Sequence, residues 1–272
     1  GVEGNVLNGN LSGSYPAVTY RITNDLTIAD GDTVNLYPGT EFLFDGTYDF
    51  NIYGTLKAMG TQQDSVIFDN FGGERWRGFT LENASSATEF QYVRISGAEK
   101  DDYWGNEGGE GGGMFIVSSN PALTHVTISN NRAFNGSGMF LRSSNPTLTH
   151  VTLENNAITE TDMGEGQCFL ESSNPTLTHV TIRNNAGGSG GGGLSLNSSN
   201  PLLTHVTITN NVGLGMSLGN SNPTLTNSII WNNLWNMGDD CFSSINSYNS
   251  QPIITYSDIE GGEDGVCPGE PN

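Results

Sequence analysis

Cationic side chains and long apolar runs are scarce in this chain, and each scarcity excludes a class of function. Only 9 of the 272 residues are Lys or Arg, against 29 Asp or Glu, which gives a formal net charge of −20. An anionic partner such as nucleic acid or an acidic membrane surface would be repelled by this balance. No run of about 18 apolar residues is present, so the sequence predicts no transmembrane segment.

Cysteine is also rare, with three residues in the chain. Three cysteines in a protein of this size form neither a disulfide scaffold nor a zinc-binding pattern. Cys241 and Cys267 are separated by about one repeat of the pattern described next, so they could lie in stacked coils. Two readings stay open: a disulfide between these coils, or two free buried thiols.

What the chain does contain is a repeat between positions 111 and 233. A Ser-Asn-Pro triplet opens each unit, a Leu-Thr pair follows it, and an Asn pair closes the unit. The triplets end at Pro121, Pro146, Pro175, Pro201 and Pro223. Self-similarity at this period predicts a solenoid, in which each unit buries its apolar face by stacking on the next.

The alternation of apolar and polar residues within each unit predicts short strands and no helix. Equivalent positions would form inward columns. One column is Met114, Met139, Cys168, Leu194 and Met216. We therefore expect an all-β fold, a right-handed single-stranded parallel β-helix of about nine or ten coils. Residues 1–75 would form the N-terminal cap and first coils, residues 76–262 the regular β-helix, and residues 263–272 a tail or linker.

The repeat Ser-Asn-Pro-Thr-Leu-Thr-His-Val-Thr-Ile-x-Asn-Asn, with glycines before its first strand, resembles the right-handed parallel β-helix repeats of the pectate-lyase-like superfamily. Segments 53–61, 76–78, 227–233 and 256–262 resemble secreted, cell-surface bacterial members. The resemblance implies the fold and an extracellular or cell-surface location. It does not select an activity, because that family includes lyases, hydrolases, epimerases and adhesins. In the family, the strand after the glycines usually belongs to the sheet that carries the substrate groove.

The outward face of that strand is the first candidate site. Alternation places Phe115, Phe140 and Phe169 in one column, with Asn197 in the column beside it. An exposed ladder of aromatic rings is suited to stacking on sugar faces, so the ladder predicts binding of a polysaccharide or cell-surface glycan. Two alternatives remain: loops that cover the rings, or self-association through this face or through the solenoid ends.

Acidic loops that enter this strand are the second candidate site. The loop at 98–110 also contains Tyr103 and Trp104, which we expect to contribute to glycan binding. The candidate calcium ligands in this loop and in the loop at 157–166 are Asp101, Asp102, Glu107, Glu110, Asp162 and Glu165. Calcium binds six to eight oxygen ligands, but no EF-hand spacing is present, so solvated acidic loops are the alternative.

Catalysis is a further possibility, and it would depend on Arg142 and Glu171, one basic and one acidic group on neighbouring strands. An exposed ion pair explains both residues equally well. Three functions therefore stay open. The first is a glycan-binding or adhesive module, the second a calcium-assisted polysaccharide lyase or glycoside hydrolase, and the third a structural spacer or filament subunit.

All four histidines, His125, His150, His179 and His205, occupy one position of the repeat. Tyr92 and Asn227 occupy the same position in the flanking units. A metal-binding ladder would require a metal ligand at this position. Because the position accepts tyrosine and asparagine, the pattern favours a polar stack at the bend between two strands.

Overall fold

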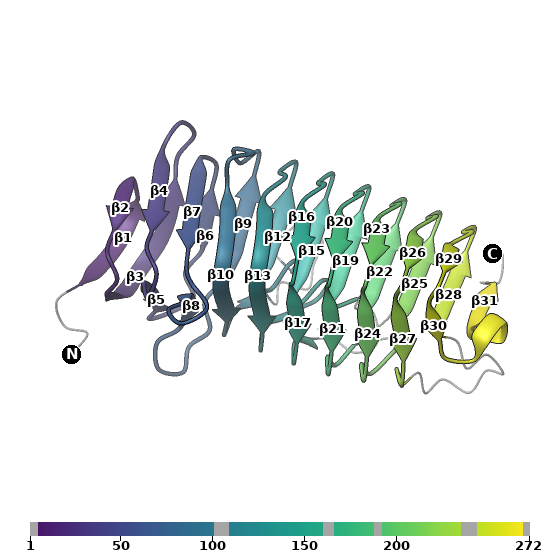
Figure 1. The fold of residues 1–272 in the computed structure, drawn as a ribbon. Coiled ribbons are helices and arrows are strands. Elements are labelled where there is room, and N and C mark those ends of the chain that lie inside the picture. The colour runs from purple at the N-terminus through teal and green to yellow at the C-terminus, as the bar shows by residue number, and fades with distance from the viewer. Residues whose placement is uncertain (1–4, 101–108, 160–165, 188–191, 235–243, 269–272) are drawn as a thin grey trace.

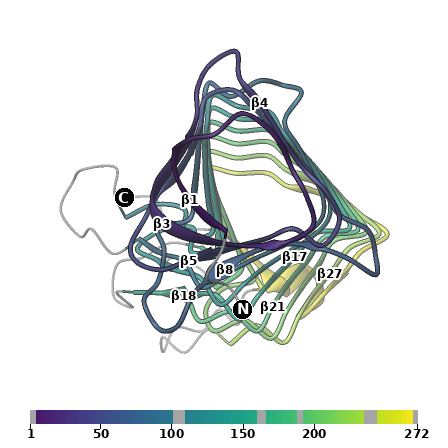
Figure 2. The same cartoon turned by 90° about the vertical axis from the view of Figure 1, so that its left-hand side faces the viewer.

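The computed structural model describes residues 5–100, 109–159, 166–187, 192–234 and 244–268. Its strands follow a coiled path and pile up along one axis, from β1 and β2 at one end to β31 at the other (Figure 1). Every pairing between consecutive coils is parallel. Seen from the end, the coils superimpose on a triangular outline with three sheets (Figure 2). The expected parallel β-helix is confirmed.

The first sheet contains the strands that follow the glycines. Its members are β6 (Phe50–Ile52), β9 (Phe79–Glu82), β12 (Met114–Val117), β15 (Met139–Arg142), β19 (Cys168–Glu171), β22 (Leu194–Asn197), β25 (Met216–Gly219), β28 (Ile245–Tyr248) and β31 (Val266–Pro268). The regular part, from β9 to β31, makes about eight turns, slightly fewer than the nine or ten coils expected. Because β31 pairs with β28, the stack continues into the segment expected to be a tail or linker.

The second and third sheets complete each coil. The second contains β2 (Gly13–Tyr15), β4 (Thr33–Leu36), β7 (Thr55–Met59), β16 (Thr147–Thr149), β20 (Thr176–Thr178), β23 (Leu202–Thr204), β26 (Thr224–Thr226) and β29 (Ile253–Thr255). The third contains β5 (Glu41–Phe44), β8 (Val66–Asn70), β17 (Thr152–Glu154), β21 (Thr181–Arg183), β24 (Thr207–Thr209), β27 (Ile229–Trp231) and β30 (Asp258–Ile259). Four strands turn a corner and join two sheets: β1 (Val6–Asn10), β3 (Thr19–Ile28), β10 (Glu89–Ser96) and β13 (Ala122–Ser129).

Two smaller features lie beside the stack. The strands β11 (Glu99–Lys100), β14 (Arg132–Ala133) and β18 (Ala157–Ile158) form a three-stranded parallel sheet. In the end view, β18 lies outside the triangle, beside its lower left part (Figure 2). A 3-10 helix, η2 (Gly262–Gly265), precedes β31. The loops that carry the small sheet are the ones that vary in length between repeats, so this corner differs from coil to coil.

Positive backbone φ angles make the bends of each coil sharp. In the unit that begins at β12, the bends fall at Ser118, His125 and Asn130, with φ values of 48°, 55° and 57°. A β-branched residue is strained in this left-handed region, whereas Asn and His are enriched there. The bend residues are therefore part of what specifies a coil.

The core consists of the inward columns expected from the sequence. Met114 pairs in register with Met139, and that column continues through Cys168 and Leu194. All four side chains are buried. The N-terminal coils are filled differently, by aromatic rings such as Phe42, which contacts Phe50 and Phe68. The aromatic core gives way to aliphatic residues as the regular repeats begin.

Buried asparagines at one corner link the coils in addition to the strand ladders. The Nδ2 group of Asn156 donates to the main-chain oxygen of Ile128 at 3.0 Å and to Oδ1 of Asn185 at 3.2 Å. Its own Oδ1 accepts from the main-chain nitrogen and Nδ2 of Asn131. One asparagine of each closing pair thus satisfies backbone groups at the corner and stacks on its equivalents along the axis.

Candidate functional site

The outward column of the first sheet differs from the sequence prediction in one important respect. Phe115, Phe140 and Phe169 are register partners, but only 5%, 1% and 7% of their surfaces are exposed. Their rings contact each other, with centroids 5.5 Å and 4.7 Å apart, and form an apolar cluster separate from the main core. The expectation of an exposed Phe ladder is therefore wrong. As they lie, the three rings cannot stack on a sugar.

Returning loops explain why these rings are covered. Gly111 and Gly136 have φ values of +67° and +57°, and each lies close to the strand that follows it. A Cβ atom on Gly111 would lie 2.6 Å from Cα of Phe115, and one on Gly136 would lie 3.0 Å from Cβ of Phe140. Glycine is needed where a backbone folds back this closely. The open alternative, in which loops fold over the rings, is the correct one.

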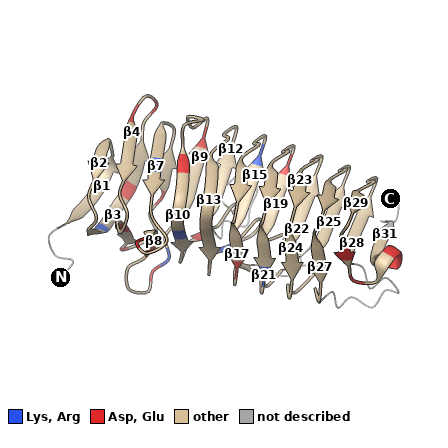
Figure 3. Cartoon of the chain, viewed as in Figure 1, with Lys and Arg blue, Asp and Glu red and all other residues tan. Residues whose placement is uncertain are grey.

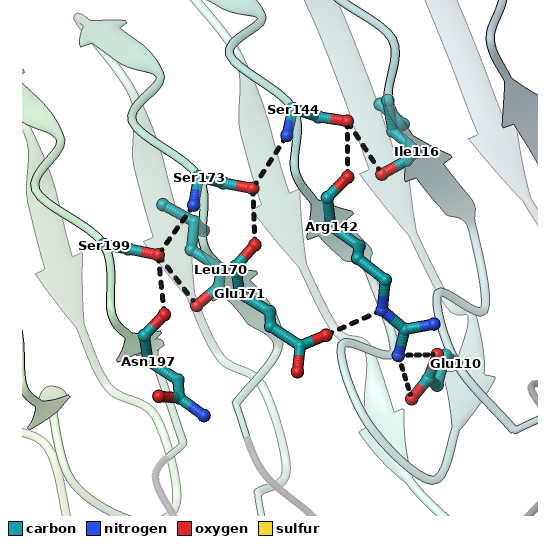
Figure 4. A network of polar contacts seen from close by, with 9 residues as sticks. All are labelled: Glu110, Ile116, Arg142, Ser144, Leu170, Glu171, Ser173, Asn197 and Ser199. Atoms are coloured by element: carbon teal, nitrogen blue, oxygen red, sulfur yellow. Dashed lines mark hydrogen bonds and ion pairs between the residues drawn. The ribbon is translucent and has the colours of Figure 1, made fainter.

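Arg142 lies at the edge of the Phe cluster and binds two carboxylates (Figure 4). Its Nε lies 2.6 Å from Oε2 of Glu171, and its Nη2 lies 3.0 Å and 2.8 Å from the two oxygens of Glu110. Its guanidinium carbon lies 5.4 Å from the ring centroid of Phe115 and 5.2 Å from that of Phe140. Arg142 is thus fixed by ion pairs on one side and by aromatic faces on the other.

Lys100 was not singled out from the sequence, yet it lies at the other side of Phe115. Its Nζ lies 5.4 Å from that ring centroid and donates to Oγ1 of Thr80 at 3.0 Å. Burial lowers the pKa of Lys100 to about 8, because the ammonium group is poorly solvated there. The sequence feature that could have indicated Lys100 as a site residue is a single lysine beside an acidic loop, in a chain with few cations.

Polar side chains form an exposed strip next to the covered cluster. Arg142, Glu171, Asn197, Gly219 and Tyr248 are successive register partners on β15, β19, β22, β25 and β28. Asn197 is exposed and the others are partly exposed. We call these five residues the outer strip. Their spacing is that of neighbouring strands, about 4.8 Å. The strip carries guanidinium, carboxylate, amide and phenol groups in one row.

A row of serines supports this strip from the adjoining corner. Ser144 Oγ donates to the main-chain oxygen of Arg142, and Ser173 Oγ donates to that of Glu171 (Figure 4). Each hydroxyl also accepts from the preceding coil: the main-chain nitrogen of Ser144 donates to Ser173 Oγ at 3.0 Å. These bonds hold the strip residues of neighbouring coils in register.

Most of the candidate calcium ligands lie outside the described residues. They are Asp101, Asp102, Glu107, Asp162 and Glu165, and the same holds for Tyr103 and Trp104. The sixth candidate, Glu110, is paired with Arg142. In the part of the chain that is described, no group of three or more His, Cys, Asp or Glu side chains could hold a metal ion.

The histidine column is a stack of exposed rings. Tyr92 and the four histidines follow one another with centroid distances of 4.4, 4.6, 4.8 and 4.7 Å and interplanar angles of at most 15°. An ion midway between two such rings would lie about 2.3 Å from each ring plane. Its distance to any ring nitrogen would therefore be longer than a Zn–N bond of about 2.0–2.1 Å. The geometry favours the polar stack over the metal-binding ladder.

Two of the three cysteines are described. Cys267 is disulfide-bonded, whereas Cys168 is a free thiol buried in the core. Cys241 lies outside the described residues. Burial raises the pKa of the Cys168 thiol to about 12, so it is unreactive as a nucleophile in the folded protein.

Comparison with known families assigns the fold. The model of the family described as "Right handed beta helix region" matches residues 118–268, which is more than half of the chain. This protein therefore belongs to the right-handed β-helix family. The match agrees with the resemblance to pectate-lyase-like proteins inferred from the repeat.

Comparison with individual proteins gives only a short match. A segment of 65 residues is 34% identical to Protein bark beetle of Drosophila melanogaster. The segment is 23% of this chain but only 2% of that protein, so the chain spans a very small part of its relative. No solved structure gives a significant match. Among the described residues, none of the helices has the length and apolar character needed to cross a membrane.

Proposed function

We propose that this β-helix is a carbohydrate-binding or adhesive module that contacts a glycan through the outer strip. The observation that carries the proposal is the row of register partners formed by Arg142, Glu171 and Asn197. Guanidinium, carboxylate and amide groups are planar and offer two hydrogen-bonding atoms side by side. Neighbouring hydroxyls on a sugar ring present a matching pair of donors and acceptors.

Rigidity of the strip supports the same proposal. Arg142 is held by Glu110 and by two aromatic faces before any ligand arrives, and the serine row fixes the backbone beneath it. A ligand therefore does not have to order this side chain, which reduces the entropic cost of binding. The buried Phe cluster acts here as a support under the strip, in place of the direct sugar contact expected from the sequence.

We also propose an extracellular or cell-surface location. Cys267 is disulfide-bonded, and disulfides persist in oxidising compartments. The excess of acidic residues is compatible with solubility there. Calcium bound by the acidic loops stays a proposal, and it is tested by adding a chelator to the binding assay below.

The test is incubation with a panel of neutral and acidic polysaccharides, with calcium or with chelator, followed by size-exclusion chromatography. Co-elution of the protein with intact polymer is the expected result. Asn197→Ala and Arg142→Ala should each abolish it. Arg183→Ala is the matched control, because Arg183 also forms an ion pair with a glutamate on a neighbouring coil, but on the third sheet.

Other outcomes would replace the proposal. Shortened polymer would identify a lyase or hydrolase, and Glu171→Gln should then remove turnover. No interaction across the panel would leave the structural spacer as the better account. Retained binding by both strip variants, with the control unchanged, would move the glycan contact to another face.

A further inference from the structure

A small polar pocket lies at the N-terminal side of the outer strip. It has a volume of about 280 Å³ and is lined by Thr47, Gly73, Glu74, Arg75, Arg77 and Glu99. The lining comes from the loops that precede β6 and β9 and from β11. The pocket therefore belongs to the same edge of the solenoid as Lys100 and Glu110, but it shares no residue with the outer strip.

Arg75 is held rigidly at this pocket by main-chain oxygens. Its Nη1 donates to the carbonyl of Asn130 at 2.7 Å and to that of Ala98 at 3.3 Å. Its Nε lies 3.2 Å from Oε2 of Glu99. Nη2 makes no hydrogen bond to a described residue, and 29% of the side chain is exposed. Two N–H groups of a fixed guanidinium thus remain available.

Cations are concentrated around this pocket. Arg75, Arg77 and Arg132 are three of only nine basic residues in the chain, and the ribbon carries few other blue segments (Figure 3). Arg132 shares Glu99 with Arg75, at a distance of 3.9 Å, and Arg77 lies 3.7 Å from Asp49. Burial, followed by the charge of Arg132, lowers the pKa of Arg75. The carboxylates of Glu99 and Asp69 act in the opposite direction, and a bound anion would add to their effect.

We propose that this pocket binds a compact oxyanion, namely a sulfate, phosphate or carboxylate group, either free or carried by a larger molecule. Arg75 supplies the fixed donors, Arg77 supplies a second guanidinium, and the Thr47 hydroxyl offers a neutral donor at the rim. Glu74 and Glu99 limit the affinity, because they place negative charge on the same wall. The inference does not depend on glycan binding by the outer strip.

Isothermal titration with sodium sulfate, phosphate and acetate, each against chloride at constant ionic strength, tests the proposal. We expect saturable binding of at least one anion with a Kd on the order of 1 mM, the weak end of specific affinity. Arg77→Gln should weaken binding at least about tenfold, which corresponds to the loss of one charged contact. Arg183→Gln, a paired arginine on the third sheet, is the control and should bind like the wild type.

Glu74→Gln separates a binding site from a structural cluster. Glu74 is exposed, and its replacement removes one negative charge from the pocket wall. We expect it to tighten anion binding severalfold, which loss of structure would not do. The ranking of the three anions then identifies the group that is bound. Absence of saturable heat with all three, or equal binding by the wild type and Arg77→Gln, would overturn the proposal.

Discussion

Arg142 on β15 and Glu171 on β19 are register partners, and their Nε and Oε2 atoms lie 2.6 Å apart. Arg183 and Glu154 form the corresponding pair on the third sheet, with Nε and Oε2 2.9 Å apart. The two pairs differ in their surroundings. Arg142 also binds Glu110 and lies against two phenylalanine rings, whereas half of the Arg183 side chain is exposed.

This difference predicts unequal losses of stability. Arg142→Ala should lower the free energy of unfolding by about 2 kcal/mol, because it removes two charged contacts and two aromatic contacts. Arg183→Ala should cost less than about 1 kcal/mol, as expected for an exposed ion pair. Urea denaturation of both variants measures the two values. Equal losses would mean that the surroundings of Arg142 add nothing.

Phe140→Ala should behave as a core substitution. The ring is 1% exposed, so its removal leaves a cavity and should cost about 3–5 kcal/mol. Phe140→Leu should cost less, since it keeps most of the apolar volume. Denaturant melts of the pair provide the measurement. A Phe140→Ala protein of unchanged stability that fails to bind glycan would restore the role of an exposed ring.

Lys100 should give the protein a specific pH dependence. Burial holds its folded-state pKa near 8, below the ordinary value of 10.5, so the unfolded chain binds more protons between these values. Stability should therefore rise with pH from about 8 to 10.5, by up to about 3 kcal/mol. The measurement is the difference in unfolding free energy between the wild type and Lys100→Met across that window. A constant difference would show that the Lys100 charge is not suppressed by folding.

The buried asparagine row should be far more sensitive than the exposed one. Asn156→Ala leaves the oxygen of Ile128 and the main-chain nitrogen of Asn131 without these partners, and it removes one of the two hydrogen bonds of the Asn131 Nδ2 group, at a cost of about 3 kcal/mol. Asn145→Ala removes an exposed bond to the main-chain nitrogen of Asn174, which water can replace, and should cost well under 1 kcal/mol. Thermal melts of both variants test the contrast. Similar melting temperatures would argue against a structural role for the buried row.

Cys168 should resist alkylation in the native protein. Burial raises the pKa of its thiol to about 12, and 1% of the residue is exposed, so almost no accessible thiolate exists at neutral pH. Mass spectrometry after iodoacetamide treatment should show labelling of Cys168 only in denaturant. Rapid labelling without denaturant would indicate that this coil opens readily.

Periodic features of the molecule could be predicted from the sequence, and features that depend on loops could not. The inward columns, the Asn corners and the position of the stacked histidines occur at fixed offsets in the units, so an alignment of the units places them. The cover over Phe115 depends on the course of the loop that enters β12 through Gly111, and a left-handed glycine does not reveal that course in the sequence. Lys100 likewise reaches Phe115 from a strand outside the triangular stack.

Candidate site residues divide in the same way. Arg142, Glu171 and Asn197 lie where the alternation predicts, because strand geometry alone decides the side on which they project. The partnership of Arg142 with Glu110 joins a strand to a loop, and no periodic signal relates those two positions. The pocket beside Arg75 has no periodic signal for the same reason, since its lining comes from two loops and from β11.

Because successive coils pair in the same register, the length of this molecule is set by the number of its repeats. Gain or loss of one unit of the regular repeat would lengthen or shorten the axis by about 4.8 Å and leave the cross-section unchanged. A binding partner that spans several coils would then shift by one step along the same surface. Related chains with more or fewer repeats could therefore change the distance between two bound partners while keeping both binding surfaces unchanged.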